Sequence, residues 1–208
     1  MQDQQTPQLY LISPPQLELA GFAEVLSAIL DSRAVACFRL SLASVDEDEI
    51  ARAADHCREI CHQRDVAIVI DRHFRLVERL GLDGCHLGPD AKLLREVRKE
   101  LGSEAIVGSH CGTSRHQGLT AGEIGADYVS FGPLSTSALG DGQVADIELF
   151  QWWSDVIEVP VVAEGGLNVD LIETLAPITD FLAIGSEIWG DAAPASALDR
   201  LLKPLSGI

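Results

Sequence analysis

The chain has 208 residues, of which 47% are apolar, so it is long enough for one well-buried core and short for two. Its 15 Lys and Arg against 32 Asp and Glu give a net charge of −17, which argues against nucleic acid and an anionic membrane as partners because both need a basic footprint. We therefore expect a single domain over residues 1–208. Because no apolar run approaches roughly 20 residues and the polar start "MQDQQTPQ" is unlike a signal peptide, we also expect a cytoplasmic protein.

Strand-like runs alternate with helical patterns from one end of the chain to the other. The predicted strands lie at 9–13, 34–40, 66–70, 84–87, 105–109, 127–131, 160–164 and 180–185. The predicted helices lie at 16–31, 46–63, 74–81, 90–101, 114–124, 145–156, 168–175 and 192–203. Several strands are apolar almost throughout, which is typical of parallel strands that are covered on both faces. The alternation predicts a single (β/α)8 TIM barrel. A doubly wound open sheet is the alternative, disfavoured because "LISPPQ" stands where a glycine-rich turn would open the first helix.

The five cysteines stand at irregular spacing, which predicts reduced thiols rather than disulfides. Cys57 and Cys61 have histidines beside them and could suggest a metal site. However, they lie at helical spacing with Ile50 and Ala54, so we interpret them as the buried stripe of a helix. Adjacent indoles at Trp152 and Trp153 similarly indicate packing or a contact between copies, and the protein could be a homodimer.

Glycine turns follow the last two predicted strands. Gly165 and Gly166 come after one strand, and Gly185 and Ser186 come after the other. In a barrel these turns are neighbours at the carboxyl ends of the strands, where backbone N–H groups can bind a phosphate without any basic side chain. We predict that these four residues bind a phosphate; a tight turn without a ligand is the alternative.

Two acidic residues stand beside these turns and would oppose a bound anion. Glu164 precedes the first turn and Glu187 follows the second. We therefore expect at least one of them to point away from the anion or to pair with Arg39 or Arg72.

Charged residues also end the second and third predicted strands. Arg39 closes an apolar run and is costly to bury unpaired, so we expect it to contact an anion or to pair with Asp71. Asp71 itself could hold a hydrated Mg²⁺, and it could instead cap the helix that begins near Phe74.

Histidines end two further strands. His110 is the better catalytic candidate because its loop, "GSHCGTSRH", is rich in reactive side chains, whereas His86 is more readily explained as a hydrogen-bonded structural residue. A nucleophilic pair of His110 with Cys111 is disfavoured because adjacent residues of a strand point to opposite faces.

Five segments of the chain together resemble the thiamine phosphate synthase superfamily, which also contains the thiazole tautomerases. They are "LYLIS" (9–13), "DGCHLGPD" (83–90), "GADYVSFGP" (125–133), "VPVVAEGGLN" (159–168) and "ITDFLAIGSEI" (178–188). The resemblance implies a (β/α)8 barrel that binds a small phosphorylated heterocyclic substrate. In the synthase reaction, an aminomethylpyrimidine diphosphate is joined to a thiazole phosphate while Mg²⁺ neutralises the departing pyrophosphate.

The resemblance also implies roles for individual residues. Arg39 keeps the arginine of the family's Gln-x-Arg-x-Lys, and Asp71 keeps one metal-binding carboxylate. Asp90 lies one position before the family's second metal-binding aspartate. Ser186 matches a serine of the last phosphate-binding turn. In the loop "SFGPLSTSALGDG" (130–142), Ser135 and Ser137 are the expected substrate contacts.

Other family residues of the diphosphate region are replaced in this chain, and the replacements favour a changed reaction. They are found at Cys37, Ser41, Ile70, Ala91, Leu139 and Gly140. The sequence therefore leaves three hypotheses open. The first is a synthase-like transferase acting on a phosphorylated thiazole. The second is a metal-independent tautomerase that uses His110 as acid and base, and the third is a non-catalytic barrel that binds a phosphorylated ligand.

Overall fold

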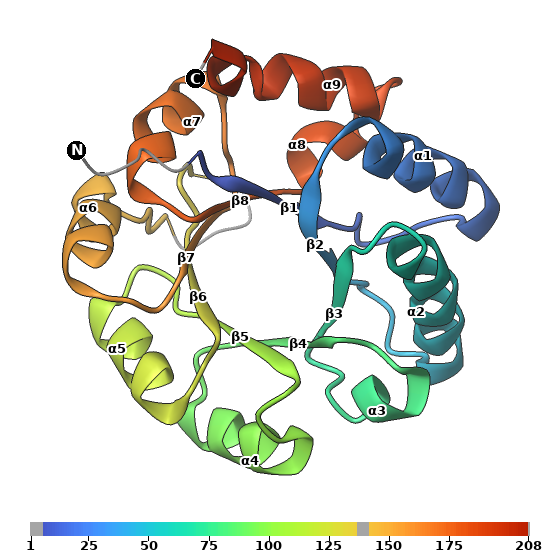
Figure 1. Cartoon of the computed structure of the whole chain (residues 1–208), viewed down its shortest axis with the longest axis horizontal. Helices are drawn as coiled ribbons and strands as arrows, with labels where there is room; N and C mark the ends of the chain where they lie inside the picture. The colour runs from blue at the N-terminus through green and yellow to red at the C-terminus, as the bar shows by residue number, and fades with distance from the viewer. Residues whose placement is uncertain (1–5, 137–141, 208) are drawn as a thin grey trace.

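A computed structural model describes residues 6–136 and 142–207, and it is a closed barrel of parallel strands (Figure 1). Each strand pairs with the next in chain order, and the last pairs with the first. The strands are β1 (Gln8–Ile12), β2 (Val35–Leu40), β3 (Ala67–Asp71), β4 (Gly84–Leu87), β5 (Ile106–His110), β6 (Tyr128–Phe131), β7 (Val161–Glu164) and β8 (Phe181–Ile184). The (β/α)8 prediction is confirmed, and every predicted strand overlaps an observed one.

Helices form a ring around the barrel (Figure 1). They are α1 (Leu19–Ser32), α2 (Glu47–His62), α3 (Leu76–Leu80), α4 (Ala91–Leu101), α5 (Arg115–Ile124), α6 (Ile147–Val156), α7 (Val169–Leu175), α8 (Ser186–Trp189) and α9 (Pro194–Leu201), with 3₁₀ turns at Ala176–Ile178 and Lys203–Gly207. Helix α8 was not predicted, because a single turn is too short to show the helical period of apolar residues. This short helix lies between β8 and α9.

Polar side chains fix where several helices begin. Each accepts a hydrogen bond from a backbone N–H of the first turn: Asp46 on α2, Asp90 on α4, Ser114 on α5, Asp146 on α6 and Asn168 on α7. Such a cap satisfies N–H groups that have no partner within the helix. Because each of these helices follows a strand, the caps lie around the carboxyl ends of the strands.

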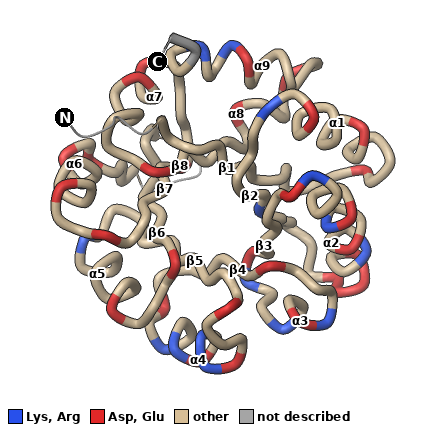
Figure 2. The backbone as a smooth tube through the Cα atoms, viewed as in Figure 1, with Lys and Arg blue, Asp and Glu red and all other residues tan. Residues whose placement is uncertain are grey.

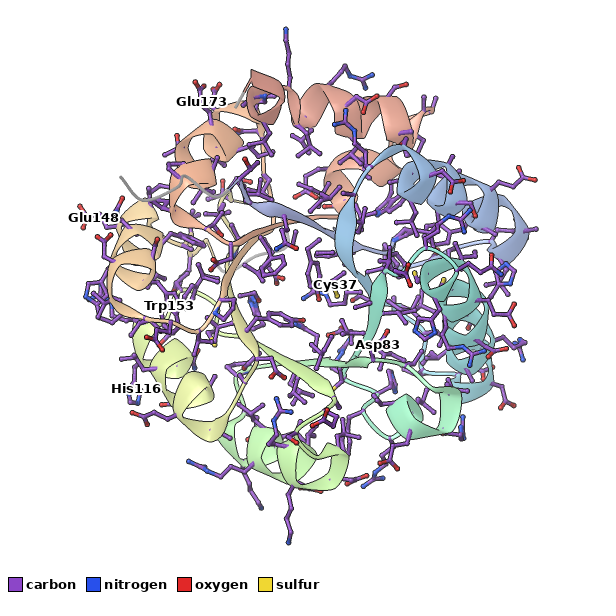
Figure 3. The ribbon with its side chains drawn as sticks, viewed as in Figure 1. Cys37, Asp83, His116, Glu148, Trp153 and Glu173 are labelled. Carbon is purple, nitrogen blue, oxygen red and sulfur yellow. The ribbon has the colours of Figure 1, made fainter. Side chains whose placement is uncertain are left out.

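Side chains of alternate strand residues fill two cores. Residues that point outward pack against the helices and include Leu11, Phe38 and Ile68. Residues that point inward form a smaller cluster of Tyr10, Cys37, Val69, Tyr128, Val162 and Ala183. Cys37 projects into the barrel in Figure 3. The interior is therefore packed, and the next inward position of each strand lies at the mouth formed by the carboxyl ends.

The cysteines and the tryptophan pair lie as expected. All five cysteines are buried and free, and Cys57 and Cys61 face the core from α2. Trp153 is buried with its indole N–H donating to the Val159 carbonyl at 2.7 Å. Trp152 is partly exposed and carries the Arg115 guanidinium 4.1 Å above its ring.

Acidic residues are distributed around the outer helices, and Figure 2 shows α6 and α7 with acidic residues and no basic ones. Within the described ranges, no helix has the length and apolar character needed to cross a membrane.

Candidate active site

The inward residues at the carboxyl ends of the strands are polar, in contrast to the packed layer beneath them. They are Arg39, Asp71, His86, His110, Ser130 and Glu164. Each lies two residues after a position of the same strand that faces the barrel interior. Because the direction alternates along a strand, all six side chains point into the mouth of the barrel. Most of them were predicted to lie at this mouth, but most of their contacts with each other were not predicted.

A buried ion pair crosses the barrel between β2 and β7. Arg39 Nη1 lies 3.0 Å from Glu164 Oε2, and the two side chains are only 8% and 13% exposed. Arg39 therefore pairs with Glu164, so the predicted pairing with Asp71 is wrong. The expectation that Glu164 or Glu187 would pair with an arginine is confirmed for Glu164.

Electrostatic attraction keeps both members of this pair charged. Burial alone would raise the pKa of Glu164, but Arg39 and a hydrogen bond from His110 outweigh it and hold that pKa well below its usual range. Burial likewise opposes the charge of Arg39, and the Glu164 carboxylate overcomes it, which raises the pKa of the guanidinium.

His110 is oriented by the same carboxylate. Its Nδ1 lies 2.9 Å from Glu164 Oε1 and 3.0 Å from the Ser130 hydroxyl. Because the Nδ1–H donates to Glu164, Nε2 is the ring nitrogen that can exchange a proton with a ligand. The side chain is 32% exposed, so part of the imidazole is open to solvent.

His86 belongs to a deeper hydrogen-bonded chain. Its Nδ1 lies 2.9 Å from the Tyr128 hydroxyl, which in turn lies 2.7 Å from the Tyr10 hydroxyl. Burial lowers the pKa of His86 well below its usual value, and the charge of Arg39 lowers it further. Burial also raises the pKa of both tyrosines, so all three groups are neutral near pH 7. The prediction of a structural role for His86 agrees with these contacts.

Two buried polar atoms around the ion pair have no hydrogen-bond partner among the described residues. They are Nε of Arg39 and Nε2 of His86. Buried polar atoms of this kind are costly unless a ligand or water satisfies them. They therefore mark the mouth of the barrel as a place where a polar ligand binds.

One group of side chains at the mouth has the donor types of a transition-metal site. His86, His110 and Glu164 offer donor atoms that all lie within 4.8 Å of one another. However, Arg39 contacts the same carboxylate, and its permanent positive charge disfavours a second cation there. Mg²⁺ also prefers oxygen ligands, so this cluster does not fit that ion.

The carboxylates predicted to bind Mg²⁺ lie at the ends of β3 and β4. Asp71 Oδ2 accepts from the Ser41 hydroxyl at 3.1 Å and from Arg72 Nε at 3.2 Å. The alternative role of Asp71 as a helix cap is wrong, because α3 begins at Leu76 and its N-cap is Arg75. Asp90 does cap a helix, through Oδ1. Asp71 therefore fits a metal ligand better than Asp90 does.

The loop after β3 has an unusual backbone that places a cation beside Asp71. Arg72 has a φ of +65°, in the left-handed region that non-glycine residues rarely adopt. Its side chain is 68% exposed, so the ion pair with Asp71 faces solvent. Solvent screening makes such a pair weak, and a phosphate ligand could recruit Arg72 without breaking a buried contact.

The two glycine turns converge on one carboxylate, that of Glu187. Its Oε1 accepts from the N–H groups of Gly166 at 2.8 Å and Leu167 at 3.1 Å, and its Oε2 accepts from the N–H of Gly185 at 2.8 Å. Gly165 and Gly166 both have a positive φ, 85° and 78°. These loops thus bind an anion by backbone N–H groups, and the anion in this structure is the protein's own side chain.

The loop after β6 packs on the first glycine turn. Leu134 N–H donates to the Gly165 carbonyl at 2.7 Å, and a Cβ at position 166 would collide with the Ser135 hydroxyl. Ser135 therefore lies beside the backbone N–H groups that donate to the Glu187 carboxylate. Ser137, the other predicted contact of this loop, lies outside the described residues.

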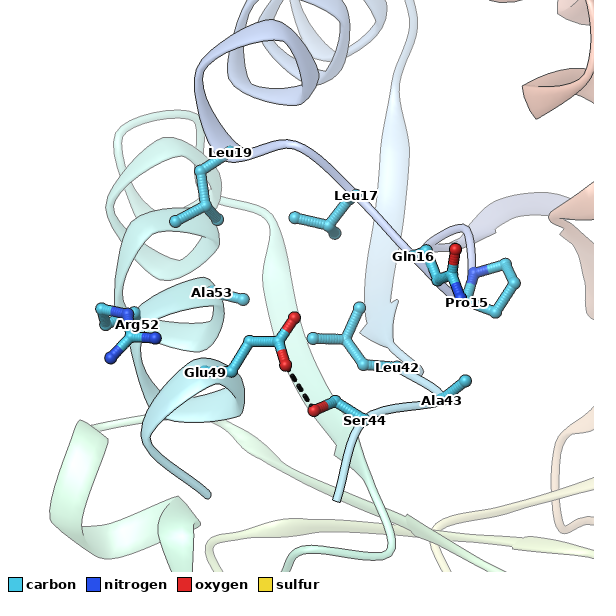
Figure 4. Close-up of a pocket in the computed structure, with 10 residues that line it drawn as sticks. All are labelled: Pro15, Gln16, Leu17, Leu19, Leu42, Ala43, Ser44, Glu49, Arg52 and Ala53. Carbon is cyan, nitrogen blue, oxygen red and sulfur yellow. Dashed lines mark hydrogen bonds between the residues drawn. The ribbon is translucent and has the colours of Figure 1, made fainter. Parts of the chain in front are cut away.

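A hollow of about 480 Å³ lies next to the mouth, between the loops after β1 and β2 and the start of α2 (Figure 4). Its lining includes apolar Leu17 and Leu42 and the charged side chains of Glu49 and Arg52. Glu49 Oε2 accepts from the Ser44 hydroxyl at 2.5 Å.

The disfavoured nucleophile pair is also excluded by the environment of Cys111. This thiol is buried, and burial raises its pKa to about 11, so the reactive thiolate is scarce near neutral pH. Glu164 was expected either to point away from the anion or to pair with an arginine, and its second contact, with His110, was not predicted. Its position directly after an apolar strand was the available signal.

Comparison with known proteins agrees with this geometry. A family model described as thiamine monophosphate synthase matches residues 9–188. The chain belongs to the thiamine monophosphate synthase family. A thiamine-phosphate synthase of Rhodospirillum centenum is 40% identical over 96% of this chain and 98% of its own length. A thiamine-phosphate synthase of Erythrobacter litoralis is 41% identical over 90% of this chain and 91% of its own length.

A solved structure of another protein has the same fold. The thiamine phosphate pyrophosphorylase from Pyrococcus furiosus superposes with a TM-score of 0.82, covers 97% of this chain and 96% of its own, and is 22% identical. At that identity the likeness shows the barrel alone.

Proposed function

We propose that this protein is a thiamine-phosphate synthase, a transferase that joins an aminomethylpyrimidine diphosphate to a thiazole phosphate and releases pyrophosphate. The proposal is supported by the relatives of that name, which match over nearly their whole length. One observation in the structure carries it: backbone N–H groups of two neighbouring glycine turns converge on one carboxylate, that of Glu187, in the arrangement that a phosphate would need.

The thiazole phosphate would place its phosphate on these turns. Gly165, Gly166, Gly185 and Ser186 surround the donors, and Ser135 lies against Gly166. In a chain with a net charge of −17, backbone donors are a means of holding phosphate that needs no lysine. Ser137 remains a predicted contact of the same loop.

In the proposed reaction the thiazole ring nitrogen attacks the methylene carbon of the pyrimidine substrate. A C–N bond forms, the C–O bond to the diphosphate breaks, and the bonding electrons leave with pyrophosphate. Asp71 would hold Mg²⁺, with the second oxygen of Asp90 as a further ligand, and the metal when bound neutralises the charge of the departing pyrophosphate.

The residues of the barrel interior would bind the reacting rings. Arg39 Nε and His86 Nε2 are buried donors or acceptors that a polar heterocycle could satisfy. Arg39 would donate its Nε–H to the substrate, with its charge balanced by Glu164. Glu164 holds that arginine in place and orients His110, whose Nε2 could exchange a proton with the aminopyrimidine.

The replacements in the diphosphate region bear on the rate of this reaction. Ser41 binds Asp71 instead of providing a cation, and Cys37 is part of the packed interior. Leu139 and Gly140 lie outside the described residues. Fewer cations near the diphosphate should weaken stabilisation of the leaving group, so we expect turnover in the low part of the usual enzyme range, about 1 s⁻¹.

Pyrophosphate release by the purified protein tests the proposal. With Mg²⁺ and both substrates we expect pyrophosphate to form, and we expect none when either substrate is omitted or when EDTA removes the metal. Asp71→Asn should lose most of the activity, whereas Asp90→Asn should retain its fold and much of its rate. The absence of any pyrophosphate, with both substrates shown to bind, would contradict the proposal and favour the non-catalytic barrel.

A second candidate function is supported by the contact between His110 and Glu164. An imidazole held by a carboxylate at 2.9 Å is suited to move a proton, as a metal-independent thiazole tautomerase requires. Isomerisation of a thiazole tautomer in the presence of EDTA would support it. An equal rate in His110→Gln would remove it.

A further inference from the structure

Glu187 occupies donors that the proposed substrate needs. Its carboxylate accepts three backbone hydrogen bonds, two from the turn after β7 and one from Gly185 after β8. Its contacts in the described part of the chain are with backbone N–H groups. Hydrogen bonds from N–H groups to an ionised acceptor are stronger than neutral ones.

We propose that Glu187 acts as an internal competitor of the substrate phosphate. In the free protein its carboxylate fills the anion site, and it must leave before a phosphate can bind. The proposal rests on the proposed function, because it takes the two glycine turns as the phosphate site.

The number of N–H donors makes the Glu187 carboxylate and a phosphate direct competitors. Gly166, Leu167 and Gly185 each offer one N–H, and each already donates to Glu187 at 2.8 to 3.1 Å. A phosphate that entered beside the carboxylate would find no free hydrogen at these atoms and would meet a like charge. The two anions therefore exclude each other.

The carboxylate can leave without unfolding its helix. Glu187 is half-buried and Ser186 is exposed, so the side chain has a path to solvent. By contrast, Ile188 is fully buried, and the Trp189 indole N–H donates to the Ile12 carbonyl at 2.6 Å. These two residues hold α8 against β1 and the core, so that rotation of one side chain is enough to open the site.

An internal competitor lowers apparent affinity by the fraction of molecules in which the site is open. Removal of the Glu187 carboxylate should therefore tighten phosphate binding, by about tenfold or more if the closed state holds at least nine molecules in ten. The alternative is that Glu187 braces the two turns. A brace would have the opposite effect, because its removal would disorganise the donors and weaken binding.

Amide NMR on the folded protein separates these roles. Inorganic phosphate and thiazole phosphate are titrated separately, without the pyrimidine substrate, while the amide signals of Gly166, Leu167 and Gly185 are followed. The variants are Glu187→Ala and Glu187→Asp. The aspartate keeps the charge, but its side chain is one methylene too short to span both turns. Glu173→Ala is the control, since it removes one charge from an exposed residue that points outward from α7 (Figure 3).

We expect the same three amides to shift in every titration, with a dissociation constant at least about tenfold lower in Glu187→Ala than in the wild type. Glu187→Asp should fall between them, and Glu173→Ala should match the wild type. Equal or weaker binding by Glu187→Ala, with the three amides still responding, would overturn the proposal and leave the phosphate site intact. If neither phosphate moves these amides in any variant, the phosphate site itself is wrong, and the proposal fails with it.

Discussion

Glu164 is the residue on which the polar interior of the barrel depends. One carboxylate oxygen contacts Arg39 and the other accepts from His110, so this single side chain neutralises a buried cation and orients an imidazole. The sequence allowed Arg39 and His110 to be placed at the mouth from the ends of their strands. It also offered Glu164 as a partner of Arg39, but it did not reveal that the same carboxylate contacts His110, because which residues meet across a closed barrel depends on side-chain reach and not on position along the chain.

Removal of one member of the pair should cost far more stability than removal of both. Glu164→Leu leaves the Arg39 guanidinium buried and unpaired, so we expect the free energy of unfolding to fall by about 3–5 kcal/mol. The double variant Arg39→Met with Glu164→Leu should recover most of that loss while remaining inactive. Urea unfolding of the two single variants and the double variant measures the coupling; additive losses would show that the pair is not coupled.

The same pair gives stability a defined pH dependence. The pKa of Glu164 lies lower in the folded than in the unfolded state, so the ionised form favours folding. This contribution is complete above the unfolded pKa of about 4.3 and is lost as the pH falls toward the folded pKa. Below about pH 4.3 the double variant should therefore lose less stability per pH unit than the wild type.

At the scale of elements, strands and caps were predictable and the contacts of loops were not. Apolar runs such as 66–70 and polar residues such as Asp90 carry local signals of a strand and a helix start, and both are observed. Convergence of the turns after β7 and β8 was predicted from the barrel itself. The contact of Glu187 with the N–H groups of these turns was not predicted, because the sequence reveals the charge of this residue but not which atoms its side chain reaches.

The turn after β7 requires glycine at position 166 for two reasons, its backbone conformation and the space available, and a pair of variants separates them. Gly166 has a φ of +78° and is crowded by Ser135, whereas Gly102 has a φ of +75° and open space around it. Gly102 has a ψ of −166°, a conformation that only glycine readily adopts, so Gly102→Ala should cost about 1–3 kcal/mol from backbone strain alone. Gly166→Ala should cost about 1 kcal/mol or more beyond that from crowding, and it should also lose phosphate binding.

Thermal unfolding and a phosphate titration of both variants check this expectation. Equal losses of stability in the two variants would show that Ser135 moves aside without a cost in folding free energy. Phosphate binding that persists in Gly166→Ala would place the phosphate away from this turn.

Across the whole molecule, the excess of acidic residues sets the response to salt. A net charge of −17 is spread over the outer helices, and exposed ion pairs such as Arg33 with Asp199 contribute little each (Figure 2). Screening of repulsion should therefore outweigh the weakening of these pairs. We expect the melting temperature to rise between about 0.05 and 0.5 M salt, and a fall would show that the ion pairs dominate. The homodimer remains a prediction.

A crystal structure of the protein with thiazole phosphate tests the central claim most directly. We expect the phosphate within hydrogen-bonding distance of the N–H groups of Gly166 and Gly185, the thiazole ring directed toward Arg39 and His110, and Glu187 turned to solvent. A thiazole phosphate bound elsewhere, with the Glu187 carboxylate still on its three N–H groups, would contradict the account.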